Sequence, residues 1–324
     1  VELGKGCGAS QEALGTLSAL ACTAHFWRDD FQSAYPAGCE ALQLLPRGSR
    51  RWMQALGNML TFTSLMGKQD HFRSLVGEFS VVSPSADALG AYVEAGSLLI
   101  SMFSFGGLRD AAQGFIGLVE AAADSAIKTD PLSRSWWLQA CGIFRLMLGD
   151  KPQLAMQLTR DGLQAARDAG SRRIQVLISA FLGMSLASSG DHASAESVLR
   201  DNLHQAQRLA EPLSISHAKV WLAMALCERG DAAALPEAEK LAGEVLATPG
   251  ANAFYVLACQ YVRAAAAVGR GDFAAASAAF AAGAALHPYL PILHGLALAT
   301  QLAVLRQSGQ LSEAQPILDT AKAL

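Results

Sequence analysis

Residues 271–280, Gly-Asp-Phe-Ala-Ala-Ala-Ser-Ala-Ala-Phe, decide the fold of this chain. Apart from Asp272, the stretch contains no acid, base, nucleophile or metal ligand, so its residues are suited to packing. Alanine follows the glycine at the fifth position, Ala276, and a large apolar residue follows at the ninth, Phe280. Glycine ends one helix in a left-handed conformation, aspartate caps the next, and alanine lets two helix backbones approach closely. The stretch therefore predicts two packed helices joined by a tight turn.

The same pattern recurs, with variations, along the whole chain. Its anchor residues are Asp29, Gly67, Gly106, Gly149, Gly190, Gly230, Gly271 and Gly309. Successive anchors are 38 to 43 residues apart, and an internal period of this size is typical of a stacked array of helical units. Loops that contain proline or glycine separate the units, for example 45–51 and 128–134. We therefore expect an all-α solenoid.

Composition narrows the function classes. Of the 324 residues, 52% are hydrophobic and only 7% are aromatic, and the net charge of −3 gives no electrostatic reason to expect nucleic acid or an anionic membrane as partner. The six cysteines form no C-x-x-C pair, which favours buried thiols in a reducing, cytoplasmic location. Residues 273–305 lack Asp, Glu, Lys and Arg, but Pro288 and Pro291 divide them into pieces shorter than the roughly 18 residues of a spanning helix. We expect two buried solenoid helices there and no membrane span.

The sequence resembles the tetratricopeptide repeat family. Residues 181–195, Phe-Leu-Gly-Met-Ser-Leu-Ala-Ser-Ser-Gly-Asp-His-Ala-Ser-Ala, look like that family's Leu-Gly pair followed by Gly-Asp and Ala. The period of about 40 exceeds the usual 34, and longer repeats of this kind are similar to those in large bacterial regulators, C-terminal to a serine/threonine kinase domain or a regulatory ATPase domain. The resemblance implies a right-handed α-α superhelix of about eight helix pairs, forming one domain over 1–324 that is a sensor or docking part of a larger protein.

Motifs that carry catalysis or bind cofactors are missing from the sequence. There is no G-x-x-x-x-G-K-[ST], G-x-S-x-G, H-E-x-x-H or EF-hand motif and no kinase signature. His287 and His294 are seven residues apart, across two prolines and without a Cys or carboxylate between them, which argues against a metal site. We expect no catalytic residues, no cofactor and no metal, and therefore a protein that is not an enzyme.

The first helix of each pair lines the concave surface in arrays of this family, which places a set of residues of this chain on one face. The candidate binding residues on that face are Trp136, Met184, His217, Met224 and Tyr261. Two interpretations remain open. Tight curvature buries this apolar face against neighbouring repeats, or the face is a groove in which the methionines adapt to a ligand and the aromatic rings anchor it.

Two arginines stand at one rim of the expected groove. Arg172 and Arg173 begin a first helix, where a guanidinium can reach an acidic group of a ligand. The alternative is surface ion pairing with Asp161 or Asp168.

The sequence thus favours a non-enzymatic protein-interaction or ligand-sensing module of a bacterial regulatory protein. Its expected partner is a protein or peptide, or an apolar small ligand, bound in the concave groove. The alternative is a freestanding scaffold that assembles a multiprotein complex.

Overall fold

The computed structural model describes residues 6–149, 151–248 and 252–284, the segment 314–322, and the single positions 302, 305, 306 and 309. Helices and the loops between them account for these residues, and no strand occurs among them. The helices are α2 (Gln11–Trp27), α3 (Phe31–Leu44), α4 (Arg50–Leu65), α5 (Gln69–Val81), α6 (Leu89–Phe105), α7 (Arg109–Thr129), α8 (Pro131–Met147), α9 (Pro152–Asp168), α10 (Arg172–Ser188), α11 (His192–Leu209), α12 (Pro212–Glu228), α13 (Leu235–Leu246), α14 (Ala253–Gly269), α15 (Phe273–Ala284) and α17 (Ala314–Lys322), with a 3-10 turn η1 (Ala86–Ala88) before α6.

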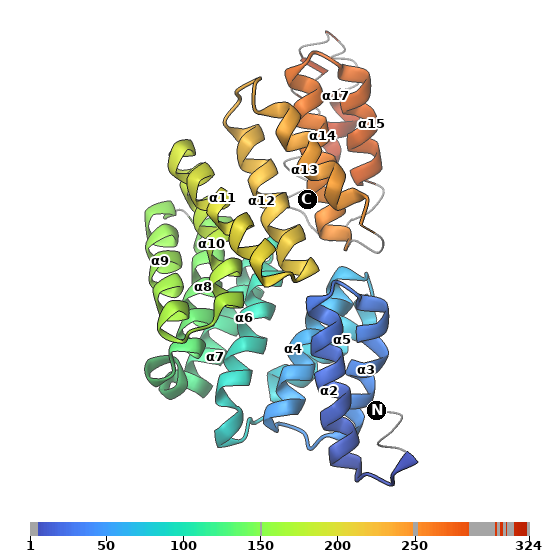
Figure 1. The fold of residues 1–324 in the computed structure, drawn as a ribbon, viewed down its shortest axis with the longest axis vertical. Helices are drawn as coiled ribbons and strands as arrows, with labels where there is room; N and C mark the ends of the chain where they lie inside the picture. Colours follow the sequence, from blue (N-terminus) through green and yellow to red (C-terminus); the bar gives the residue numbers. More distant parts are fainter. Residues whose placement is uncertain are drawn as a thin grey trace.

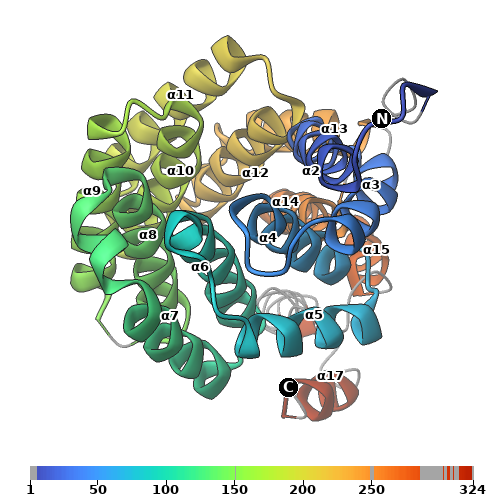
Figure 2. The ribbon, with the colours of Figure 1, turned by 90° about the horizontal axis from the view of Figure 1, so that it is seen from below.

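Successive helices form antiparallel pairs, and the pairs stack into a right-handed superhelix (Figure 1). Each even-numbered helix from α2 to α14 packs against the odd-numbered helix that follows it and against the next even-numbered helix. In Figure 2 the helices α6, α8, α10 and α12 follow the inside of the coil, and α7, α9 and α11 follow the outside. One continuous hydrophobic core runs from Ala19 in α2 to Val262 in α14. The all-α solenoid expected from the repeats is confirmed.

The turns within the pairs have the expected chemistry. The anchors Asp29, Gly67, Gly190, Gly230, Gly271 and Gly309 all have positive φ, between 60° and 85°. Aspartates cap the following helices through their side chains; for example, Asp191 accepts from the Ser194 amide at 3.1 Å and Asp272 from the Ala275 amide at 3.0 Å. Ala195 and Ala276, at the fifth position after their anchors, are fully buried.

Two anchors depart from the expectation. The left-handed residue of the third unit is Gly107 (φ 72°) and not Gly106, so Ala112, which is fully buried, takes the packing role that the expected register gave to Ala111. Gly149 has no positive φ, and α8 ends two residues before it, at Met147. Consecutive glycines at 106–107 and the insertion around Pro152 make these registers ambiguous in the sequence.

Among the described residues, one helical stretch, Ala86–Phe105, is long and apolar enough to cross a membrane, and 72% of its most apolar window is buried inside the protein. Of the apolar segment 273–305, the structure describes α15 and little more, so Pro288, Pro291, His287 and His294 lie outside the described residues. Within the described part of the chain, no group of three or more His, Cys, Asp or Glu side chains is placed to hold a metal ion. Four of the cysteines, Cys22, Cys141, Cys227 and Cys259, behave as small apolar side chains, because burial raises the pKa of each thiol to about 12.

Candidate functional site

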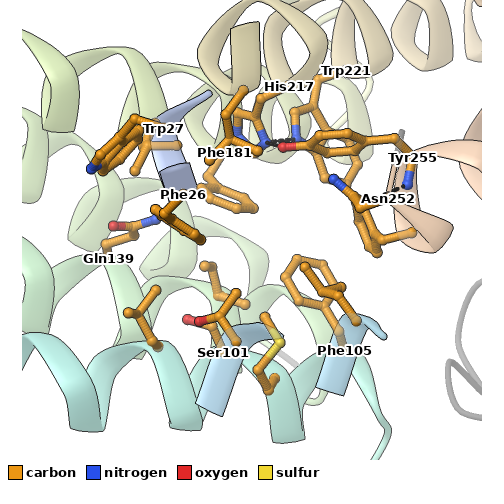
Figure 3. A pocket seen from close by; sticks show the side chains of 18 of the residues that line it. Phe26, Trp27, Ser101, Phe105, Gln139, Phe181, His217, Trp221, Asn252 and Tyr255 are labelled. Carbon is orange, nitrogen blue, oxygen red and sulfur yellow. Dashed lines mark hydrogen bonds between the residues drawn. The ribbon is translucent and has the colours of Figure 1, made fainter. Parts of the chain in front are cut away.

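A cavity of about 120 Å³ lies inside the coil, between the inner faces of the first helices. Helical spacing explains why these residues meet there: Leu98, Ser101 and Phe105 lie on one face of α6, and Leu177 and Phe181 on one face of α10. Most of the wall is aromatic. Its aromatic residues are Phe26, Trp27, Phe31, Phe105, Trp136, Phe181, Trp221, Phe254 and Tyr255. In Figure 3 the labelled side chains point from their helices into a common space.

The wall of this cavity is completed because the coil returns on itself. Helix α2 of the first pair contacts α12 of the sixth pair, and the Asn252 side-chain amide donates to Asp29 Oδ1 at 3.3 Å across 223 residues of sequence. Phe26, Trp27 and Phe31 from the first pair thus face Phe254 and Tyr255 from the seventh. A ligand in this cavity touches both ends of the superhelical turn.

An arginine fastens the junction on its outer side. The Arg173 guanidinium lies 4.3 Å from the centre of the Trp27 ring. Its Nε donates to both carboxylate oxygens of Glu211, at 2.9 and 3.0 Å, and an Nη also donates to Glu211. Trp27 therefore separates the cavity from a second, external pocket that Arg173 and Glu211 line. A planar guanidinium is suited to this combination of stacking and two-pronged ion pairing.

The polar side chains of the cavity are few and deeply buried. His217 Nδ1 lies 3.2 Å from the Tyr255 hydroxyl and accepts from Trp221 Nε1 at 3.3 Å. Burial lowers the pKa of His217 to about 4, an effect that the Leu177 backbone opposes, so the imidazole is neutral at pH 7. His217 Nε2 and Gln139 Oε1 have no hydrogen-bond partner. The cavity therefore combines a large apolar wall with two unpaired polar atoms.

Two carboxyl groups near the cavity are destabilised as anions. Burial raises the pKa of Asp29 to about 6, although the hydrogen bond from Asn252 opposes the shift, and Asp29 Oδ2 has no partner. Burial raises the pKa of Glu94 to about 7, against the opposing charges of Arg173 and Arg50. Glu94 lies one helical turn before Leu98, on the side of α6 that faces the interior.

The structure brings two of the seven candidate residues into the cavity, Trp136 and His217. Met224 is buried in the continuous core, and Met184 and Tyr261 pack partly buried against that core. These three do not line the cavity.

The two candidate arginines have different surroundings. Arg172 is exposed and lines a polar surface pocket with Asp201 and Arg208. Arg173 pairs with Glu211 and not with Asp161 or Asp168.

Sequence reasoning missed the residues that the first and seventh pairs contribute. Trp27, Asp29 and Phe31 lie around the turn of the first pair, and Asn252 and Tyr255 lie at the start of α14. The repeat period shows where each pair begins, but it does not show how many pairs complete one superhelical turn. The junction between distant pairs therefore had no signal in the sequence.

Comparisons with known proteins were made on this basis. No family model matches the chain, and no curated protein sequence matches it. Solved structures do match. A Rap protein complexed with Competence and Sporulation Factor is 14% identical with a TM-score of 0.58, over 97% of this chain and 90% of that one. The fold is the tetratricopeptide-like helical repeat.

Two structures of NprR are also similar to this chain. In complex with its cognate peptide NprX, NprR is 11% identical with a TM-score of 0.54, over 83% of this chain and 77% of that one. The apo form of the quorum sensor NprR from B. thuringiensis is 12% identical with a TM-score of 0.51, over 83% of this chain and 74% of that one. At these identities the likeness concerns the fold.

Proposed function

We propose that this chain is a non-enzymatic ligand-sensing and interaction module whose concave cavity binds the apolar part of a peptide or a small molecule. The observation that carries the proposal is the aromatic cavity at the junction of the first pair with the sixth and seventh. At roughly 24 cal/mol per Å³, a cavity of about 120 Å³ costs on the order of 3 kcal/mol of stability when it is empty. An occupant of the cavity offsets that cost.

The solved structures support a peptide as one form of the ligand. NprR was crystallised with its cognate peptide NprX, and the Rap protein with Competence and Sporulation Factor. Both share the superhelical fold of this chain, and such coils offer a concave surface that suits an extended partner. A peptide that enters this coil places one apolar side chain in the cavity and meets Arg173, Glu211 and Glu94 around it.

A substitution that fills the cavity tests the proposal. Ser101 lines the cavity, and its hydroxyl donates only to the Ser97 carbonyl of its own helix, at 2.8 Å. Ser101→Leu therefore occupies the space without removing a contact between helices. We expect at least a tenfold loss of binding of toluene, and of any peptide selected on the wild type, with an unchanged or raised melting temperature.

Ser80→Leu is the matched control, because Ser80 makes the same kind of bond, to the Val76 carbonyl at 2.8 Å, on the exposed side of α5. It should leave binding unchanged. Binding of toluene and peptide that survives in Ser101→Leu contradicts the proposal.

We further infer that the module serves a cytoplasmic bacterial regulator, as the part C-terminal to a serine/threonine kinase or regulatory ATPase domain. The longer period of the repeats, shared with such regulators, supports this context. The reading frame upstream of Val1 tests it: kinase or ATPase signatures there support the regulator, and a start codon directly before Val1 favours a freestanding scaffold.

A further inference from the structure

The two unpaired polar atoms of the cavity differ in kind. His217 and Gln139 are each only 6% exposed and lie on α12 and α8. Because Trp221 donates to His217 Nδ1, the neutral ring carries its proton on Nε2, which is therefore a donor without a partner. Gln139 Oε1 is an acceptor without a partner. Buried polar groups without partners are costly, so a ligand that pairs with both gains affinity and specificity.

The same wall is poorly suited to a charged ligand. Its residues include no Lys, Arg, Asp or Glu among those that the structure describes around the cavity. Asp29 lies behind Asn252, whose side chain is already occupied: Nδ2 donates to Asp29, and Oδ1 accepts from the Tyr255 amide at 3.0 Å. A cation thus finds no carboxylate in the wall, and an anion finds no guanidinium or ammonium group.

We propose that the cavity selects an uncharged, ring-sized group that carries both a hydrogen-bond donor and an acceptor, such as an aromatic amide or a phenol. The donor of that group pairs with Gln139 Oε1, and its acceptor pairs with His217 Nε2–H. Cavities of this size in proteins hold a benzene ring. The inference rests on the proposed function and names the chemistry that its site prefers.

Four ligands of similar shape separate charge from hydrogen bonding: benzamide, toluene, benzoate and benzylammonium. We expect titration calorimetry of the whole chain at pH 7.5 to give a benzamide affinity at least tenfold above those of toluene, benzoate and benzylammonium. Equal or tighter binding of either charged ligand overturns the proposal. Toluene binding as tightly as benzamide also overturns it and leaves the proposed function standing, whereas no binding of any of the four contradicts both.

Gln139→Met tests the acceptor with little change of shape. We expect it to lower benzamide affinity to the level of toluene and to leave toluene affinity unchanged. Gln260→Met is the matched control, because Gln260 Oε1 is also buried without a partner but lies on α14, outside the cavity. A tenfold preference for benzamide that persists in Gln139→Met overturns the proposal even if a His217→Phe variant fails to fold.

The same chemistry has two natural sources, a free small molecule and a tyrosine side chain of a peptide. p-Cresol and N-acetyl-tyrosinamide carry the same phenol, and only the second carries flanking peptide groups. Binding of both supports the peptide source, binding of p-cresol alone supports a free molecule, and binding of neither overturns the assignment of phenols to this cavity.

Discussion

Asp29 stands where most of the repeats have glycine. Its φ of 60° is a left-handed conformation that costs a residue with a side chain about 1–2 kcal/mol. Its carboxyl group is 5% exposed, and Oδ2 has no partner. Backbone strain and an unpaired buried carboxyl at one residue are typical of functional sites, and Asp29 lies where the first pair meets Asn252.

Asp29→Asn should stabilise the protein above pH 6. The folded-state pKa of about 6 lies above the ordinary value of 3.8, so the group's contribution to stability is fully present below pH 3.8 and is lost as pH rises through about 6. Asparagine removes this loss, tolerates a left-handed conformation and can still accept from Asn252. We expect a gain on the order of 2 kcal/mol at pH 7.5, at 1.36 kcal/mol per pKa unit, and a much smaller gain at pH 4, measured by urea unfolding.

The adjacent Asp30→Asn is its control. Hydrogen bonds from Ser33 lower the pKa of Asp30, so its contribution is present above the ordinary pKa and lost as pH falls. This variant should lose stability at pH 7.5 or leave it unchanged. The same gain in both variants would show that the effect of Asp29 does not come from its burial.

At the level of the helix pair, glycine in the first helix sets how closely the second can lie. A Cβ added at Gly183 on α10 would stand 2.4 Å from Leu199 Cγ on α11, and one added at Gly142 on α8 would stand 2.8 Å from Thr159 Oγ1 on α9. Leu199 is fully buried. The close approach of the two backbones therefore depends on the missing side chain.

Gly183→Ala should destabilise the protein even though alanine favours helix. The overpacked contact costs about 1–3 kcal/mol, which exceeds the gain of about 1 kcal/mol in helix propensity. Gly77→Ala, in the exposed middle of α5 with nothing within 4 Å of the added Cβ, should be stabilising instead. Thermal unfolding of the two variants measures the difference; a Gly183→Ala protein that gains as much stability as Gly77→Ala contradicts the described packing.

At the level of the whole molecule, the coil is closed by contacts between pairs far apart in sequence. Arg173 connects α10 to Trp27 on α2 and to Glu211 at the start of α12. Arg173→Ala should speed amide hydrogen exchange in the last turn of α2 and the first turn of α12, because both lose their common partner. Arg172→Ala, one residue earlier and exposed, should change neither. Equal exchange in the two variants would mean that the junction does not depend on Arg173.

The sequence contains the repeats but not the closure. Gly271, Asp272 and Ala276 each have a local role that a short pattern can specify, and their predicted conformations and burial are those found. The contacts of Asp29 with Asn252 and of Trp27 with Arg173 depend on small rotations between pairs, which add up over a whole turn of the superhelix. For this reason the inner-face positions of Trp136 and His217 could be predicted, whereas the aromatic wall from the first pair could not.

The central claim is that the aromatic cavity is a ligand site, and a bromine atom can locate the ligand directly. A crystal soaked with bromobenzene should show one anomalous peak inside the coil, between Phe26, Phe181 and Trp221. Crystals of Ser101→Leu, soaked in the same way, should lack that peak. A wild-type crystal with no peak in the cavity, or with its only peak in the surface pocket beside Arg172, contradicts the account.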